Sequence, residues 1–153
     1  MRSGNAESKI NPNDAYQTFM VIWIALFVSQ FLFVGLAFFI KSDLLRFDLT
    51  KPLFGQNPVA VMALAAISVV ALALSFALRN RFLAQSVAEQ NIGLVQTAMI
   101  VGCSLAEFIS LIGLFLAFAF NYQYFFLFSG LGMLATVLHL PRRSDIAAAS
   151  FKM

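Results

Sequence analysis

The sequence predicts an all-α fold, an integral membrane bundle of four antiparallel transmembrane helices. Apolar residues make up 61% of the 153 residues and charged residues 11%, against roughly 45–50% and about 25% in a soluble globular domain. Most of the eighteen Phe residues gather in long apolar runs and do not alternate with polar residues as they would in half-buried strands. A water-soluble fold could not cover so much apolar surface, so the lipid bilayer is the expected partner.

Four apolar runs, uncharged except for Glu107 in the third, are long enough to cross the bilayer, whose hydrocarbon core of about 30 Å needs about 20 residues of helix. The runs are residues 16–40, 58–78, 94–120 and 124–140. The first follows Asn13-Asp14, a favourable helix cap, and the second begins at Pro58, a good first helical residue. The fourth stops at Pro141, which breaks a helix. A transmembrane domain, 16–140, is thus expected between a polar N-terminal tail, 1–15, and a C-terminal tail, 141–153.

The basic residues that flank the four runs predict the orientation. Seven lie on one side of the expected bundle, namely Arg2, Lys9, Arg79, Arg81, Arg142, Arg143 and Lys152, and three on the other, namely Lys41, Arg46 and Lys51. Positive charge near short loops is retained in the cytoplasm. Both termini are therefore expected to be cytoplasmic.

Several classes of function are disfavoured by composition. The net charge is +3, but the basic residues are scattered and form no dense patch, so nucleic acid is not an expected partner. Cys103 is the only cysteine and allows no intrachain disulfide; in an apolar run it is expected to be a small packing residue. His139 is the only histidine, which excludes a multi-histidine metal site, and it is expected at the cytoplasmic membrane surface. No metal, cofactor or active site of the chain's own is predicted.

Glu107 is the candidate functional residue. It is the fourteenth of twenty-seven residues in the third run, which places it near the bilayer midplane. An ionised side chain there costs about 2.5–3.5 kcal/mol on insertion scales. The carboxyl group is therefore expected to be protonated, paired, or turned toward protein interior or a water-filled cavity. We interpret Glu107 as an ion-carrying candidate, with a purely structural hydrogen-bonding role as the alternative.

Polar groups near Glu107 are its expected supports. Ser104 and Ser110 lie three residues before and after it and share its helix face, so a polar notch is predicted. The polar residues at similar depth in the other runs are Ser29, Gln30 and Ser68. Gln30 is the preferred partner, because an amide can donate to a carboxylate or accept from a carboxylic acid.

Small residues predict where the helices approach closely. In the third run they are Gly102, Ala106, Ser110, Gly113 and Ala117, and in the fourth Gly130 and Gly132. Such spacing lets two helix backbones pack tightly in lipid.

Residues 79–125 carry three features of a known hairpin. Arg79-Asn80-Arg81 follows a run rich in small residues, Glu107 lies in mid-membrane, and Gly113-Leu114 follows six residues later. This pattern resembles the helical hairpin of the c subunit, or proteolipid, of rotary ATP synthases. The resemblance implies that Glu107 takes up a proton from one half-channel and returns it to another, in a ring of identical copies.

The chain also departs from that family. The second run has alanines where the inner helix of a proteolipid has closely spaced glycines, the loop is longer and lacks Arg-Gln-Pro, and extra helices flank the hairpin. Two functions are therefore carried forward. The first is a proton- or cation-translocating subunit with Glu107 as carrier. The alternative is a non-catalytic accessory or assembly subunit whose apolar faces bind other membrane subunits or further copies of the chain.

Overall fold

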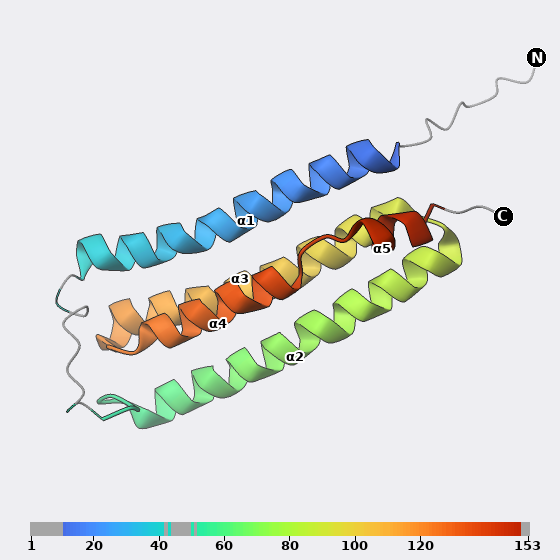
Figure 1. The fold of residues 1–153 in the computed structure, drawn as a ribbon. Coiled ribbons are helices and arrows are strands. Elements are labelled where there is room, and N and C mark those ends of the chain that lie inside the picture. The colour runs from blue at the N-terminus through green and yellow to red at the C-terminus, as the bar shows by residue number, and fades with distance from the viewer. Residues whose placement is uncertain (1–10, 42, 44–49, 51, 151–153) are drawn as a thin grey trace, which may run out of the picture.

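The computed structural model describes residues 11–41, 43, 50 and 52–150, and all regular secondary structure in them is helical. The helices are α1 Pro12–Ile40, α2 Pro58–Glu89, α3 Ile92–Phe120, α4 Phe125–Leu138 and α5 Arg143–Ala148. The first four run up and down beside one another (Figure 1). Three of them, α1, α2 and α3, are long and apolar enough to cross a membrane, which fits an integral, multi-pass membrane protein.

Local polar groups define the helix ends. The Asn11 side chain accepts a hydrogen bond from the Asn13 N–H at 3.1 Å, and Asn91 does the same for Gly93 at 2.9 Å. Gln90 and Asn121 end α2 and α3 in the left-handed conformation, with φ of 50° and 49°. Helix α1 starts before the predicted residue 16, and Ala15 is buried, so the expected N-terminal tail is helical from Pro12. Residues 1–10 lie outside the described part.

Helix α2 is longer than the predicted span 58–78, because it continues through Arg79-Asn80-Arg81 to Glu89. Its 32 residues extend over about 48 Å at 1.5 Å per residue, more than the hydrocarbon core requires. The arginines end the apolar surface without ending the helix. The connection to α3 is correspondingly short and consists of Gln90 and Asn91.

Helix α4 is shorter than the predicted span 124–140. Its 14 residues cover about 21 Å, and the helix ends before Pro141, which has no N–H to continue it. Residues 139–142 lead into α5, so that α4, this link and α5 together follow the length of the bundle (Figure 1). The expectation of a tail after Leu140 is wrong for residues 143–150, because Ile146 and Ala149 are buried.

Helix α3 is the centre of the arrangement and packs against α1, α2 and α4. Helices α1 and α2 lie on opposite sides of the α3–α4 pair (Figure 1). One apolar cluster, which includes Leu116 and Phe125, fills the end near the α3–α4 turn. A second, which includes Phe19, Cys103 and Ile146, fills the end near α5, and Cys103 is fully buried there.

Candidate functional site

Glu107 lies in the middle of α3, fifteen residues after Ile92 and thirteen before Phe120. At 1.5 Å per residue it is therefore about 20 Å from either end of the helix. The side chain is partly buried between α3 and α1. Its Oε1 atom is 2.6 Å from the hydroxyl oxygen of Ser29 on α1, a short hydrogen bond that joins the two helices.

The Ser29 hydroxyl has a second close oxygen, the main-chain carbonyl of Leu26 at 2.7 Å. A hydroxyl group has one hydrogen to donate and lone pairs to accept with. Ser29 can therefore donate to only one of these two oxygens at a time. Its interaction with Glu107 depends on which of the two groups carries the hydrogen between them.

Gln30, the preferred partner of Glu107 in the sequence, makes different contacts. Its amide nitrogen donates to the Thr136 hydroxyl of α4 at 2.5 Å, and its amide oxygen accepts from the Ser110 hydroxyl of α3 at 2.8 Å. The side chain is fully buried. The prediction that Gln30 pairs with Glu107 is wrong, because the rotation of α1 turns Ser29 to the carboxyl group and Gln30 to α4.

The other predicted supports make no hydrogen bond to Glu107 in the described part of the chain. Ser110 is buried and belongs to the Gln30 contact, whereas Ser104 is exposed on α3. Ser68 is buried on α2, where its hydroxyl donates to the Leu64 carbonyl of its own helix at 2.8 Å. Within the described residues, the polar notch around Glu107 is thus reduced to Ser29 and the Leu26 carbonyl that Ser29 reaches.

The outer surface beside Glu107 is apolar. Phe108, Leu111 and Phe115 of α3 are exposed large side chains. The ion pair formed in the described part of the chain joins Arg79 of α2 to Asp145 of α5 at 3.2 Å and lies near the α5 end, away from the middle of α3. Within that part, Glu107 has no basic partner.

The small residues differ in how closely they are packed. A Cβ atom placed on Gly102 would be 2.1 Å from His139 Cδ2, one on Gly113 would be 2.7 Å from the Phe125 carbonyl oxygen, and one on Gly132 would be 2.2 Å from Ser110 Oγ. These three glycines lie at close helix contacts, and Ala106 is fully buried beside them. Gly130 differs from the expectation, since a Cβ there meets nothing within 4 Å.

His139 is buried, although the sequence places it at the membrane surface. Its Nδ1 atom is 2.6 Å from the Ala135 carbonyl oxygen, and its ring lies 4.7 Å, centroid to centroid, from Phe76 of α2. Nε2 has no hydrogen-bond partner in the described part of the chain. In the sequence, the neighbouring Pro141-Arg142 indicated that His139 is exposed. The only signal for its burial was Gly102, whose lack of a side chain leaves space for the imidazole ring.

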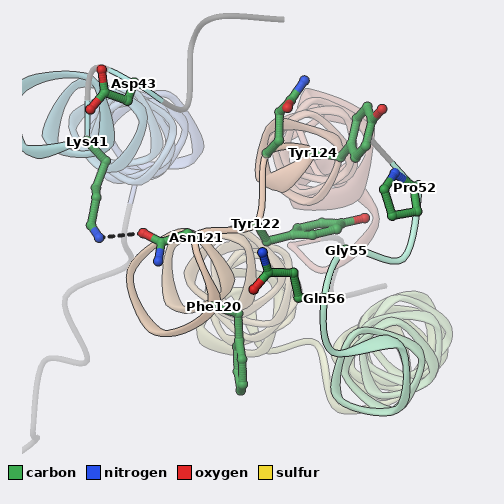
Figure 2. Close-up of a pocket in the computed structure, with 10 residues that line it drawn as sticks. Lys41, Asp43, Pro52, Gly55, Gln56, Phe120, Asn121, Tyr122 and Tyr124 are labelled. Carbon is green, nitrogen blue, oxygen red and sulfur yellow. Dashed lines mark hydrogen bonds between the residues drawn. The ribbon is translucent and has the colours of Figure 1, made fainter. Parts of the chain in front are cut away.

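A cavity of about 450 Å³ lies at the end of the bundle where α1 and α3 end. Figure 2 shows Lys41 reaching across it to Asn121, whose side-chain oxygen accepts a hydrogen bond at 2.6 Å. Tyr122 forms part of its wall and donates to the Leu53 carbonyl at 2.8 Å. Burial, and secondarily the nearby Tyr124, raises the pKa of Tyr122 above its ordinary value.

In the residues that the structure describes, the fold is all-helical and has three helices that are long and apolar enough to cross a membrane. No family model, curated protein or solved structure matches the chain.

Proposed function

We propose that the chain is a proton- or cation-translocating membrane subunit in which Glu107 carries the ion. The observation that supports this proposal is the 2.6 Å contact between Glu107 and Ser29 in the middle of α3. Acidic side chains are rare at this depth and mark ion pathways and proton relays in membrane proteins. Glu107 is partly exposed beside an apolar helix face, so it is accessible from the side of the bundle.

The contacts of Ser29 suit a carboxyl group that gains and loses a proton. When Glu107 is protonated, it donates to the Ser29 oxygen while the Ser29 hydroxyl donates to Leu26. When Glu107 is ionised, the Ser29 hydroxyl rotates and donates to the carboxylate. The distances of 2.6 and 2.7 Å fit the first arrangement, in which one hydrogen lies between each pair of oxygens. In the second arrangement no hydrogen lies between Ser29 and the Leu26 carbonyl, so these two oxygens move apart. Release of the proton from Glu107 to an acceptor on its exposed side then requires rotation of one hydroxyl and a small shift of the Ser29 side chain, with no movement of a helix.

Translocation also needs a route to each face of the membrane. The exposed face of α3, which includes Phe108 and Leu111, lies next to Glu107. We infer that another subunit or a second copy of the chain completes the route across this face, as the resemblance to the proteolipid hairpin implies. The distribution of basic residues favours cytoplasmic termini, and the end with Arg79 and Asp145 is then cytoplasmic.

Proton flux into reconstituted vesicles tests this proposal. The expected result is flux that is lost in Glu107→Gln, because an amide keeps the shape of the side chain but holds no exchangeable acidic proton. The matched control is Glu89→Gln, which removes an exposed carboxyl at the end of α2. Equal flux in the two variants, or no flux in the wild-type protein under any imposed gradient, would contradict the carrier role.

Labelling with a hydrophobic carbodiimide provides a second readout. The reagent reacts with protonated carboxyl groups in apolar surroundings, so we expect Glu107 to be modified and Glu89 to remain unmodified at neutral pH. Peptide mass measurement identifies the modified residue. Labelling confined to water-exposed acids would show that Glu107 is either ionised or inaccessible.

An accessory or assembly role is the second candidate, supported by the exposure of α1. Only 11% of the most apolar window of α1 is buried, against 50% for α3. The remaining surface of α1 is available to lipid or to the helices of a partner. Native mass measurement of the detergent-solubilised assembly separates the two candidates, since a ring of copies supports the carrier role and a single copy among different subunits supports the accessory role.

A further inference from the structure

Three buried polar side chains join α1, α3 and α4 beside the carboxyl site. The Gln30 amide donates to Thr136 at 2.5 Å and accepts from Ser110 at 2.8 Å, and the Thr136 hydroxyl lies 3.1 Å from the Gly132 carbonyl. Gln30, Ser110 and Thr136 are all fully buried. We call this set the Gln30 cluster. It connects all three helices through side-chain groups.

Gly132 provides the space for the Gln30 cluster. A Cβ atom at this position would be 2.2 Å from Ser110 Oγ, 2.6 Å from the Ala106 carbonyl oxygen and 3.2 Å from Gln30 Oε1. Real side chains almost never approach so closely. The α3 and α4 backbones can therefore approach, and the Gln30 amide can fit between them, only because residue 132 has no side chain.

Ser29 lies directly beside the Gln30 cluster. Ser29 and Gln30 are consecutive on α1, and they bond two residues that are three apart on α3, Glu107 and Ser110. Residues three apart share one face of a helix, so the two bonds act on the same strip of α3. If α1 rotated or slid by one residue, Gln30 would leave Ser110 and Ser29 would leave Glu107 together.

We propose that Gln30 is a positioning residue, which through its bonds to Ser110 and Thr136 holds the Ser29 hydroxyl against Glu107. The proposal rests on the proposed role of Glu107, but it concerns the geometry of the hydrogen bond and not the flux. In lipid no water replaces a lost side-chain partner, so removal of the Gln30 amide changes the rotation of α1. The Ser29 hydroxyl then moves away from the carboxyl group.

The C=O stretching band of protonated Glu107 in infrared spectra measures this bond directly. The band is identified by its loss in Glu107→Gln, and spectra are taken at a pH low enough for the acid to be fully protonated. In the protonated state Glu107 donates to the Ser29 oxygen, and a hydrogen bond made by a carboxylic acid lowers the frequency of its C=O stretch, so Ser29→Ala should raise it. We expect Gln30→Leu to raise it as well, and the double variant to raise it no further than Ser29→Ala alone.

Thr136→Val is a milder variant of nearly the same shape and can be measured if Gln30→Leu does not fold. It is expected to shift the band in the same direction. The matched control is Ser68→Ala, which removes a buried hydroxyl bonded within α2 and should leave the band in place. An unshifted band in folded Gln30→Leu or Thr136→Val, even with reduced thermal stability, would overturn the positioning role. Unchanged flux in Glu107→Gln overturns the carrier role instead, so the two failures are distinguishable.

Discussion

The imidazole ring of His139, directly after α4, lies against the backbone of Gly102 in α3. A Cβ atom on Gly102 would be 2.1 Å from His139 Cδ2 and 2.7 Å from Nε2. The ring also meets Phe76 of α2 at 4.7 Å between centroids. Three helices therefore converge on one aromatic ring, and their spacing depends on the absence of a side chain at position 102.

Gly102→Ala should destabilise the protein by about 1–3 kcal/mol, the usual cost of an extra methyl group in a close-packed core. The expected observation is a lower midpoint of thermal unfolding in detergent, followed by circular dichroism. Gly130→Ala is the matched control, since a Cβ there meets nothing within 4 Å. Equal midpoints for the two variants would mean that His139 does not occupy the place described.

Gly132→Ala should destabilise the protein at least as much as Gly102→Ala. The added methyl group would lie 2.6 Å from the main-chain carbonyl oxygen of Ala106 and 2.2 Å from the Ser110 hydroxyl oxygen. Adding Ser110→Ala removes the second clash and leaves the first. Ser110→Ala alone also leaves the Gln30 amide oxygen without its donor, so it serves as the reference. We expect Gly132→Ala to lower the unfolding midpoint less in the Ser110→Ala background than in the wild-type protein. No loss in that background would indicate that the backbones of α3 and α4 separate easily, and an equal loss in both backgrounds would show that the Ser110 clash contributes little.

Trp23→Phe should cost about 1 kcal/mol, the typical contribution of one hydrogen bond. The indole N–H donates to the Thr136 carbonyl at 2.9 Å. Among the described residues, the only other donor to this carbonyl is the His139 N–H at 3.1 Å, which is shared with the Ala135 carbonyl, because the Leu140 N–H donates to Val137 where α4 ends. Phenylalanine keeps the stacking on Phe27 but has no donor. An unchanged unfolding midpoint by circular dichroism would argue against this contact between α1 and α4.

The ion pair between Arg79 and Asp145 should fix α5 to α2. Its side chains are 13% and 22% exposed, and a pair of this kind contributes about 1 kcal/mol or less. Arg79→Gln should therefore speed tryptic cleavage at Arg142 and Arg143, which are exposed just before the buried part of α5. Arg81→Gln, an exposed neighbour on α2, is the control. Equal cleavage rates in the two variants would show that apolar packing alone holds α5.

Alkaline pH should weaken the contact between Tyr122 and Leu53. Burial raises the pKa of Tyr122 from its ordinary value of 10.0, so the folded protein binds this proton more tightly than the unfolded chain. The stability from this group is then fully present below the ordinary pKa and is lost as pH rises through the higher folded value. Between neutral pH and pH values above 10.0, the midpoint of thermal unfolding should fall more steeply with pH in the wild-type protein than in Tyr122→Phe. Identical pH profiles of the midpoint would contradict the prediction.

The sequence predicted α1 and α3 closely, as spans 16–40 and 94–120 against Pro12–Ile40 and Ile92–Phe120. Charged or polar residues bound these runs, and lipid excludes such groups from the interior of a span, so they mark where it ends. It predicted the apolar span 58–78 within α2 but not where the helix ends, because arginines are good helix formers in water and a helix can continue beyond its span. It failed after Leu140 because six residues of helix carry too little periodicity to be recognised.

The candidate site was also predicted only in part. The mid-helix position of Glu107 follows from counting residues, whereas its partner depends on the rotation of α1. Ser29 and Gln30 differ by about 100° around the helix axis and lie at almost the same depth. Contacts with α4, above all from Gln30 to Thr136, decide which of them faces Glu107, and no local pattern in α1 records those contacts.

Helix α1 is held differently from the other long helices. Most of its apolar surface faces outward. Its side-chain hydrogen bonds to the rest of the chain include Trp23 to Thr136, Ser29 to Glu107, Gln30 to Thr136 and Ser110, and Lys41 to Asn121. Directional bonds of this kind tolerate little sliding. The N-terminal helix should consequently detach as a unit before α2, α3 and α4 lose their mutual packing, and its amide protons should exchange with solvent earlier on mild heating.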